Sequence, residues 1–187
     1  MVEEIINETS AAVVAAVKGV DDVLGAILDV VKNQMIKVMK DTGEVSGTGI
    51  EVVASVASGA IKGGGEVGAS LTDVAVNTMH GVVSGASQVS GDVTAAIRQA
   101  AAGIIHATAA SGGDVGAAAV AAVDGAIKAA GKAGTDSAAA ATSAVGGTLD
   151  GAASVGLDAV SKVKEALESA AELPRDVIEA ALKGSDK

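Results

Sequence analysis

Two glycine-rich segments match the spacing of phosphate-binding loops. Residues 63–68 (GGGEVG) fit the G-x-G-x-x-G pattern, in which glycines let the backbone approach a phosphate at a helix N-terminus. That pattern requires a preceding strand, whereas these residues follow a predicted helix, and the Glu66 carboxylate would repel a phosphate. Residues 125–132 (GAIKAAGK) are one residue too long for a P-loop, and Ala133 follows where Ser or Thr is needed. We therefore predict a helix break at the first segment and no phosphate site at either.

The remaining candidate catalytic or metal-binding residues have no partners at a useful spacing. Ser161 and Lys164 have the S-x-x-K spacing of a serine–lysine nucleophile pair, but the companion motifs are missing and both lie on a charged helix face. His80 and His106, the two histidines, have no carboxylate three or four residues away, which is not the spacing of metal ligands. The sequence therefore predicts no enzyme, no cofactor, no metal and no small-molecule substrate.

The composition excludes further classes of protein. The chain of 187 residues has no Phe, Trp, Tyr or Cys, and its formal net charge is −10. Without cysteine it has no disulfide framework or thiolate zinc site. Without aromatic rings or a basic balance, we expect no nucleic acid partner. The acidic start (MVEEII) does not fit a signal peptide, and no stretch of about 20 apolar residues is present, so we expect a cytoplasmic protein.

The sequence repeats with a period of 22 residues. Seven blocks begin at Asp21, Gly43, Gly65, Ser87, Gly113, Thr135 and Leu157, with a four-residue insertion at 109–112. The second position of a block is acidic in six of the seven: Asp22, Glu44, Glu66, Asp114, Asp136 and Asp158. This pattern predicts an N-terminal amphipathic helix over 1–20 and seven repeats over 21–178. A C-terminal capping helix and tail follow over 174–187, opened by Pro174 and closed by Gly184.

The spacing of apolar residues within a block predicts helices. These residues recur about every 3.67 positions, the eleven-residue helical period, and no segment alternates as a strand would. Lysine near a block end, glycine beyond it and an acid at the next start are typical of one helix ending and another beginning. We therefore expect an all-α, up-and-down array of close-packed Ala/Gly/Val helices. The alternative is one or a few long continuous helices, in which Lys40–Glu44 and Lys62–Glu66 are i,i+4 pairs.

Small side chains dominate the apolar faces of the predicted helices. Ala, Gly and Val supply half of the chain, and several glycines have the small-xxx-small spacing at which helices approach closely. The predicted helix-packing residues are Gly43, Gly47, Gly59, Gly64, Gly68, Gly81, Gly85, Gly103, Gly112, Gly116, Gly147, Gly151, Val31, Val53, Ile97, Val123 and Val145.

In period and composition, residues 21–178 resemble the amphipathic repeats of synucleins, exchangeable apolipoproteins and late-embryogenesis-abundant proteins. Stretches such as 81–86 (GVVSGA) and 120–125 (VAAVDG) carry the resemblance. It implies helices that coat lipid surfaces or protect a cell under stress. The lysine-rich repeat core of synucleins is missing, and the net charge is reversed.

Three non-catalytic functions fit these features. The first is a structural or self-assembling scaffold or filament subunit, whose partner is another copy or another helical protein. The second is an amphipathic coat on a lipid, storage-granule or other apolar surface, against which the scarcity of Leu and the lack of Trp and Phe anchors argue. The third is a stress-protectant or ice-binding helical protein, since Thr72, Thr94 and Thr142 share one block position.

Overall fold

The chain folds into helices joined by short turns. The computed structural model describes residues 2–42, 47–89 and 91–185, which form nine α-helices and no strand. The helices are α1 (Val2–Ala16), α2 (Val23–Thr42), α3 (Gly47–Glu66), α4 (Leu71–Gln88), α5 (Val93–Ala110), α6 (Val115–Ala133), α7 (Ser137–Val155), α8 (Leu157–Ser169) and α9 (Arg175–Ser185). The predicted all-α, up-and-down array is confirmed. The alternative of long continuous helices is wrong, because the chain turns back after each helix.

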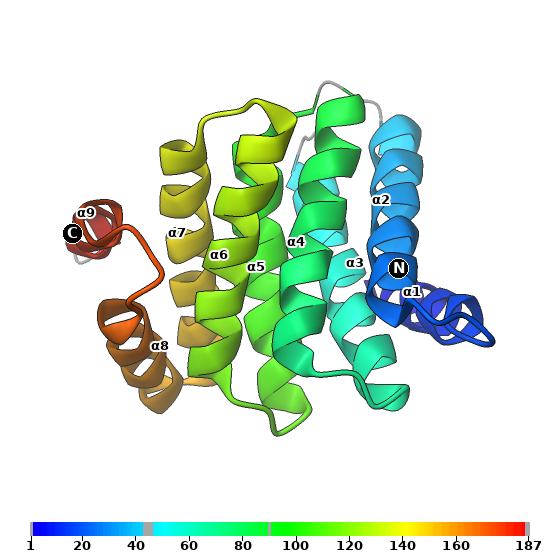
Figure 1. The fold of residues 1–187 in the computed structure, drawn as a ribbon, viewed down its shortest axis with the longest axis horizontal. Coiled ribbons are helices and arrows are strands. Elements are labelled where there is room, and N and C mark those ends of the chain that lie inside the picture. The colour runs from blue at the N-terminus through cyan, green and yellow to red at the C-terminus, as the bar shows by residue number, and fades with distance from the viewer. Residues whose placement is uncertain (1, 43–46, 90, 186–187) are drawn as a thin grey trace.

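Consecutive helices alternate between two layers. The helices α2, α4 and α6 form the front layer in Figure 1, and α3, α5 and α7 lie behind them. From α1 to α7, the most extensive contacts join helices that are two apart in the chain, within one layer. Because consecutive helices run in opposite directions, neighbours within a layer are parallel. The repeating structural unit is therefore a pair of helices, as in other solenoid proteins.

Aspartate side chains begin three of the central helices. Asp92 Oδ1 accepts a hydrogen bond from Ala95 N at 3.0 Å, at the start of α5. Asp114 and Asp136 each accept two backbone hydrogen bonds at the starts of α6 and α7. A side chain that caps a helix in this way contributes about 1 kcal/mol to stability. At the other end of α6, Gly134 has a φ of 71°, the left-handed conformation that glycine adopts without strain.

The helices are spaced differently from the predicted blocks. From α2 to α7, they begin at Val23, Gly47, Leu71, Val93, Val115 and Ser137, so that the first two steps are longer than the remaining three. Residues 109–112 are therefore no insertion: Ala109 and Ala110 complete α5, and a turn follows. The steps differ because α2 and α3 have 20 residues each and start earlier in the repeat, whereas α4 and α5 have 18 each. As a result, Glu66 and Gln88 are the last residues of their helices rather than first-turn residues, and Glu44 lies outside the described residues.

The core between the layers consists of small aliphatic side chains. The five apolar packing positions predicted from the sequence, Val31, Val53, Ile97, Val123 and Val145, have exposed fractions of 0 or 1%. Larger side chains such as Ile27, Ile61 and Met79 are also fully buried. Burial of each valine or isoleucine contributes about 1.5–3 kcal/mol, whereas an alanine methyl contributes about 0.8 kcal/mol. Helices that bury mostly alanine must therefore approach closely and make many contacts.

The last two helices depart from the regular array. In Figure 1, α8 and α9 lie at the end of the array, and α9 is seen nearly end-on, so that it runs across the other helices. Pro174 precedes α9, and its carbonyl oxygen accepts a hydrogen bond from Ile178 N at 3.1 Å. Gly184 lies within α9 rather than after its end, which corrects the prediction that it closes the helix.

Candidate binding groove

Regularly spaced glycines bring the helices of each layer together. Each helix from α3 to α7 has one such glycine, at the same position of the repeat: Gly59, Gly81, Gly103, Gly125 and Gly147. A Cβ atom added to Gly81 would lie 2.8 Å from the Leu28 carbonyl oxygen of α2. At Gly103 it would collide with the Ala54 carbonyl group of α3. Backbone lies against backbone at these points, so glycine sets the distance between neighbouring helices.

A second small residue follows each of these glycines one helical turn later. The second positions are Gly63, Gly85, Ala107, Ala129 and Gly151. A Cβ on Gly63 would lie 2.8 Å from the Ser10 carbonyl oxygen, and one on Gly151 would lie 2.7 Å from that of Ala102. Each helix from α3 to α7 thus presents two small residues, four positions apart, to the preceding helix of its layer.

The predicted packing glycines have different surroundings. Six of them contact the preceding helix of the same layer: Gly59, Gly81, Gly85, Gly103, Gly147 and Gly151. A Cβ on Gly64 would meet the Val74 side chain of α4 at 2.6 Å, and one on Gly116 would meet the Ala166 Cβ of α8 at 3.0 Å.

Four predicted packing glycines have no described packing contact. Gly68 and Gly112 have φ values of 76° and 69° and no atom within 4 Å of an added Cβ, so they serve turns instead of helix packing. Gly43 lies outside the described residues. Gly47 is the first residue of α3, and its surroundings also lie outside them.

Two packing glycines, Gly63 and Gly125, were absent from the sequence prediction. A Cβ on Gly125 would lie 3.0 Å from the carbonyl oxygen of Val76 on α4. The unbroken spacing from Gly59 to Gly147 was the signal that would have found Gly125. The supposed insertion at 109–112 moved it out of that column.

The residues that these glycines contact on the preceding helix also recur at regular positions, and we call them the receiving residues. On α5, the glycines of α7 meet the carbonyl oxygens of Arg98 and Ala102 and the Ile105 Cβ. The residues two repeats later, on α7, are Thr142, Gly146 and Leu149. All three line a groove of about 660 Å³. The receiving face of α7 therefore lies in a groove bordered by α8 and α9, in which Gly146 and Leu149 are buried, whereas the corresponding face of α5 is filled by α7.

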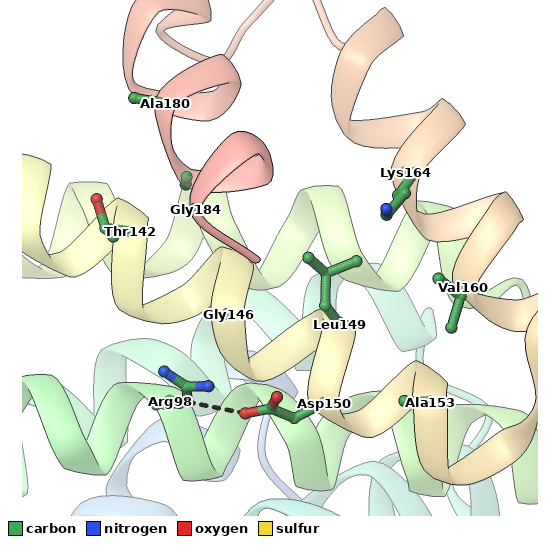
Figure 2. Close-up of a pocket in the computed structure, with 11 residues that line it drawn as sticks. Arg98, Thr142, Gly146, Leu149, Asp150, Ala153, Val160, Lys164, Ala180 and Gly184 are labelled. Carbon is green, nitrogen blue, oxygen red and sulfur yellow. Dashed lines mark hydrogen bonds and ion pairs between the residues drawn. The ribbon is translucent and has the colours of Figure 1, made fainter. Parts of the chain in front are cut away.

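The groove has an apolar floor and a polar rim. Figure 2 shows Leu149 pointing into the space between α8 and α9, with Val160 of α8 on one side and Gly184 of α9 on the other. At the rim, Arg98 Nε donates a hydrogen bond to Asp150 Oδ2 at 2.8 Å and joins α5 to α7. Both charged side chains are about half exposed, so this ion pair contributes at most about 1 kcal/mol. The groove has room for side chains of a bound polypeptide between α7, α8 and α9.

The side chains that could take part in catalysis or metal binding are not brought together by the fold. His80 is half-buried on α4 and His106 is exposed on α5, in the other layer. The Ser161 hydroxyl donates a hydrogen bond to the Leu157 carbonyl oxygen at 3.2 Å, within its own helix. Thr72, Thr94 and Thr142 lie on α4, α5 and α7 and so do not form one row. Across the described residues, no three His, Asp or Glu side chains are grouped as metal ligands.

Comparison with known proteins adds no function to this geometry. No protein family matches the sequence, and no curated protein matches it. Among the described helices, none combines the length and hydropathy required to cross a membrane. The groove on α7 is thus the main structural evidence on function.

Proposed function

We propose that this chain is a non-catalytic scaffold protein that binds a helical segment of a partner protein in the groove on α7. The observation that carries this proposal is the equivalence of Thr142, Gly146 and Leu149 with the residues of α5 that receive α7. A face with the geometry of an internal helix contact lies at the end of the layer, where α9 covers it only in part. On this proposal the protein acts in the cytoplasm.

The internal contacts indicate which kind of helix fits the groove. Every helix that packs within a layer presents glycine or alanine at two positions four residues apart, as Gly147 and Gly151 do on α7. Larger side chains would collide with the receiving backbone, which Gly151 approaches at Ala102. The partner helix therefore presents a small-xxx-small face to α7, and its larger residues contact Val160 and Ala180 at the sides of the groove.

The two layers differ in whether a second copy could continue them. On α4, Gly81 and Gly85 follow Val76, the residue that receives α6, by five and nine positions. The same offsets from Leu28 on α2 lead to Asn33 and Lys37, which are both exposed. The Lys37 ammonium also lies 2.9 Å from the Glu8 carboxylate of α1. Two polar side chains thus oppose stacking of copies in this layer. In the layer of α7, the same offsets from Ile6 on α1, which receives Gly59, lead to exposed Ala11 and Ala15. The small-xxx-small face that the groove on α7 requires is therefore also present on α1 of a second copy.

Binding of a labelled helical peptide tests the proposed function. The peptide has the sequence of residues 137–155, because α7 is the helix that packs on the equivalent face of α5. We expect saturable binding in fluorescence anisotropy. Changing both peptide residues that match Gly147 and Gly151 to leucine should abolish it.

Two matched variants of the protein locate the binding site. Ala153→Glu places a charge in the groove and should weaken peptide binding by at least about tenfold, whereas Ala138→Glu, on an exposed part of α7 outside the groove, should not. Equal binding by both variants, or by the leucine-substituted peptide, would contradict the proposal.

A further inference from the structure

A second groove crosses the front layer of the array. It lies between α2, α4 and α6, the three helices nearest the viewer in Figure 1, and has a volume of about 390 Å³. Its apolar lining comes from Leu28 of α2 and from Ala129 and Ala133 of α6. Small-molecule sites in proteins begin at about 300 Å³ and combine apolar walls with a few polar groups. The groove has the size and lining of such a site.

Two polar atoms at this groove are buried and lack hydrogen-bond partners. They are His80 Nε2 and Ser87 Oγ, on the same face of α4 and two helical turns apart. The other buried side-chain atoms without partners, among the described residues, are threonine hydroxyls of Thr9, Thr78 and Thr108, which do not line this groove. Buried polar groups in proteins are almost always hydrogen-bonded, so a pair left unsatisfied beside one groove points to a bound polar group.

The charges around the groove favour an anion. Lys132, in the last turn of α6, lines the groove and is exposed. One turn earlier, Lys128 Nζ lies 2.7 Å from the Asp124 carboxylate, so these two charges compensate each other. Burial lowers the pKa of His80, and the positive charges of Lys132 and Lys128 lower it further, against the opposing effect of Asp124. His80 is thus neutral at pH 7, and Lys132 supplies the net charge.

The ends of α4 and α6 are close to the groove, and their partial negative charge would oppose an anion. That opposition is reduced because the carbonyl oxygens of the last turns already accept hydrogen bonds. Val89 N–H, beyond α4, donates to the Ala86 and Ser87 oxygens. Gly134 N–H, beyond α6, donates to the Ala130 and Gly131 oxygens. Lys132 offsets the remaining partial charge.

We propose that this groove binds a small monocarboxylate. Its carboxylate contacts the Lys132 ammonium and accepts a hydrogen bond from the Ser87 hydroxyl, which rotates toward it, while the rest of the ligand extends along α4 toward His80. Its short aliphatic chain packs against Leu28, Ala129 and Ala133. The ligand is bound without being transformed, and this site is independent of the helix-binding groove on α7.

Butanoate is a suitable probe, and butanamide is its uncharged counterpart. The two histidines give separate ring signals in a two-dimensional ¹H–¹³C NMR spectrum, so that exposed His106 on α5 serves as an internal reference for His80. We expect butanoate to shift the His80 signals saturably and to leave those of His106 in place. Butanamide should bind at least about tenfold more weakly, because it cannot pair with Lys132. Absence of a saturable shift at about 50 mM butanoate, or equal binding of butanamide, overturns the proposal.

Charge variants separate a built site from general attraction to a positive surface. Lys132→Gln should weaken butanoate binding by at least about tenfold. Lys128→Gln removes the same charge one turn away and should change the affinity by less than about threefold. Equal losses in the two variants would show that butanoate follows overall charge and would overturn the site. Ser87→Val, which keeps the side-chain volume, should also weaken binding, and unchanged affinity there would remove Ser87 from the proposal.

Discussion

Gly147 on α7 lies so close to the carbonyl oxygen of Arg98 on α5 that no side chain fits between the two helices. The same relationship joins Gly103 to Ala54 and Gly125 to Val76, in each case at the same separation along the sequence. It is therefore a repeated structural element. The chain uses its glycines to hold parallel helices together within each layer.

Replacing Gly147 by alanine tests this contact directly. The added Cβ would overlap the Arg98 backbone, which cannot rotate away, so Gly147→Ala should destabilise the protein by about 1–3 kcal/mol in urea unfolding. Gly131, near the end of α6, is the control, because an added Cβ there would have Ser137 Oγ at 3.6 Å as its nearest contact. Gly131→Ala should stabilise the protein by up to about 1 kcal/mol. A stabilising effect at both positions would show that the helices within a layer lie farther apart than described.

The cap of α5 makes a pH-dependent contribution to stability. The hydrogen bonds from the Ala95 N–H and the Thr94 hydroxyl hold the pKa of Asp92 below its usual 3.8. A lowered pKa in the folded state means that this stabilisation is present above pH 3.8 and is lost as the pH falls through the folded pKa. Asp92→Ala should therefore cost about 1 kcal/mol at pH 7 and less at about pH 2. The measurement is urea unfolding of both proteins at the two pH values.

Ser70 provides a matched control for that prediction. It precedes α4 at the equivalent position, but its side chain makes no capping hydrogen bond and instead pairs with the Thr72 hydroxyl at 2.8 Å. Ser70→Ala should have a smaller effect than Asp92→Ala, with no change between the two pH values. An equal, pH-independent loss in both variants would argue against the capping role of Asp92.

His80 should give the protein a second pH dependence, at higher pH. Burial, with the nearby Lys132 and Lys128, lowers the pKa of this histidine in the folded state below 6.5. The unfolded chain then binds the proton more readily, so stability falls as the pH drops below about 6.5 until the folded pKa is reached. His80→Gln should flatten the free energy of unfolding over this range, as measured by urea titrations at successive pH values. The same slope in His80→Gln as in wild type would contradict this origin.

The mass of the isolated protein shows whether the partner at the groove on α7 is a second copy. Asn33 and Lys37 oppose stacking of copies through α2, whereas α1, at the end of the layer of α7, has exposed Ala11 and Ala15. A mass that stays near 17.7 kDa in light scattering between about 10 and 100 µM would make a different protein the partner. A mass that rises with concentration would instead favour self-assembly and would make a second copy the partner at the groove on α7.

The helical array follows from local features of the sequence, but its exact register does not. The apolar period and the glycines at helix ends predicted one helix for each repeat, because both act within a single turn of helix. Glu66 and Asp114 look equivalent in the sequence, yet one ends α3 and the other caps α6. An acidic residue is favourable at a helix start, and no short-range rule distinguishes it from an exposed acid elsewhere. That ambiguity placed the supposed insertion at 109–112.

Neither groove could be predicted, because each depends on contacts between distant segments. The groove on α7 exists because α9 crosses the array beyond Pro174 instead of continuing the layer, and no local signal gives the direction of that crossing. The second groove brings Leu28, His80 and Lys132 together from three helices. Along its own helix, His80 has no carboxylate three or four residues away, so the sequence predicts no ligand there. Its neighbours across the layer become visible only after the helices are packed.

The alternation of layers also determines which changes of length the fold tolerates. Removing residues 93–136, which hold α5 and α6, leaves α7 in its own layer and pointing in its original direction. Removing a single helix with its turn instead reverses every later helix and transfers it to the opposite layer, where its glycines face the wrong neighbours. The chain can therefore be shortened or lengthened by duplication only in even numbers of helices, although its sequence repeats with every one.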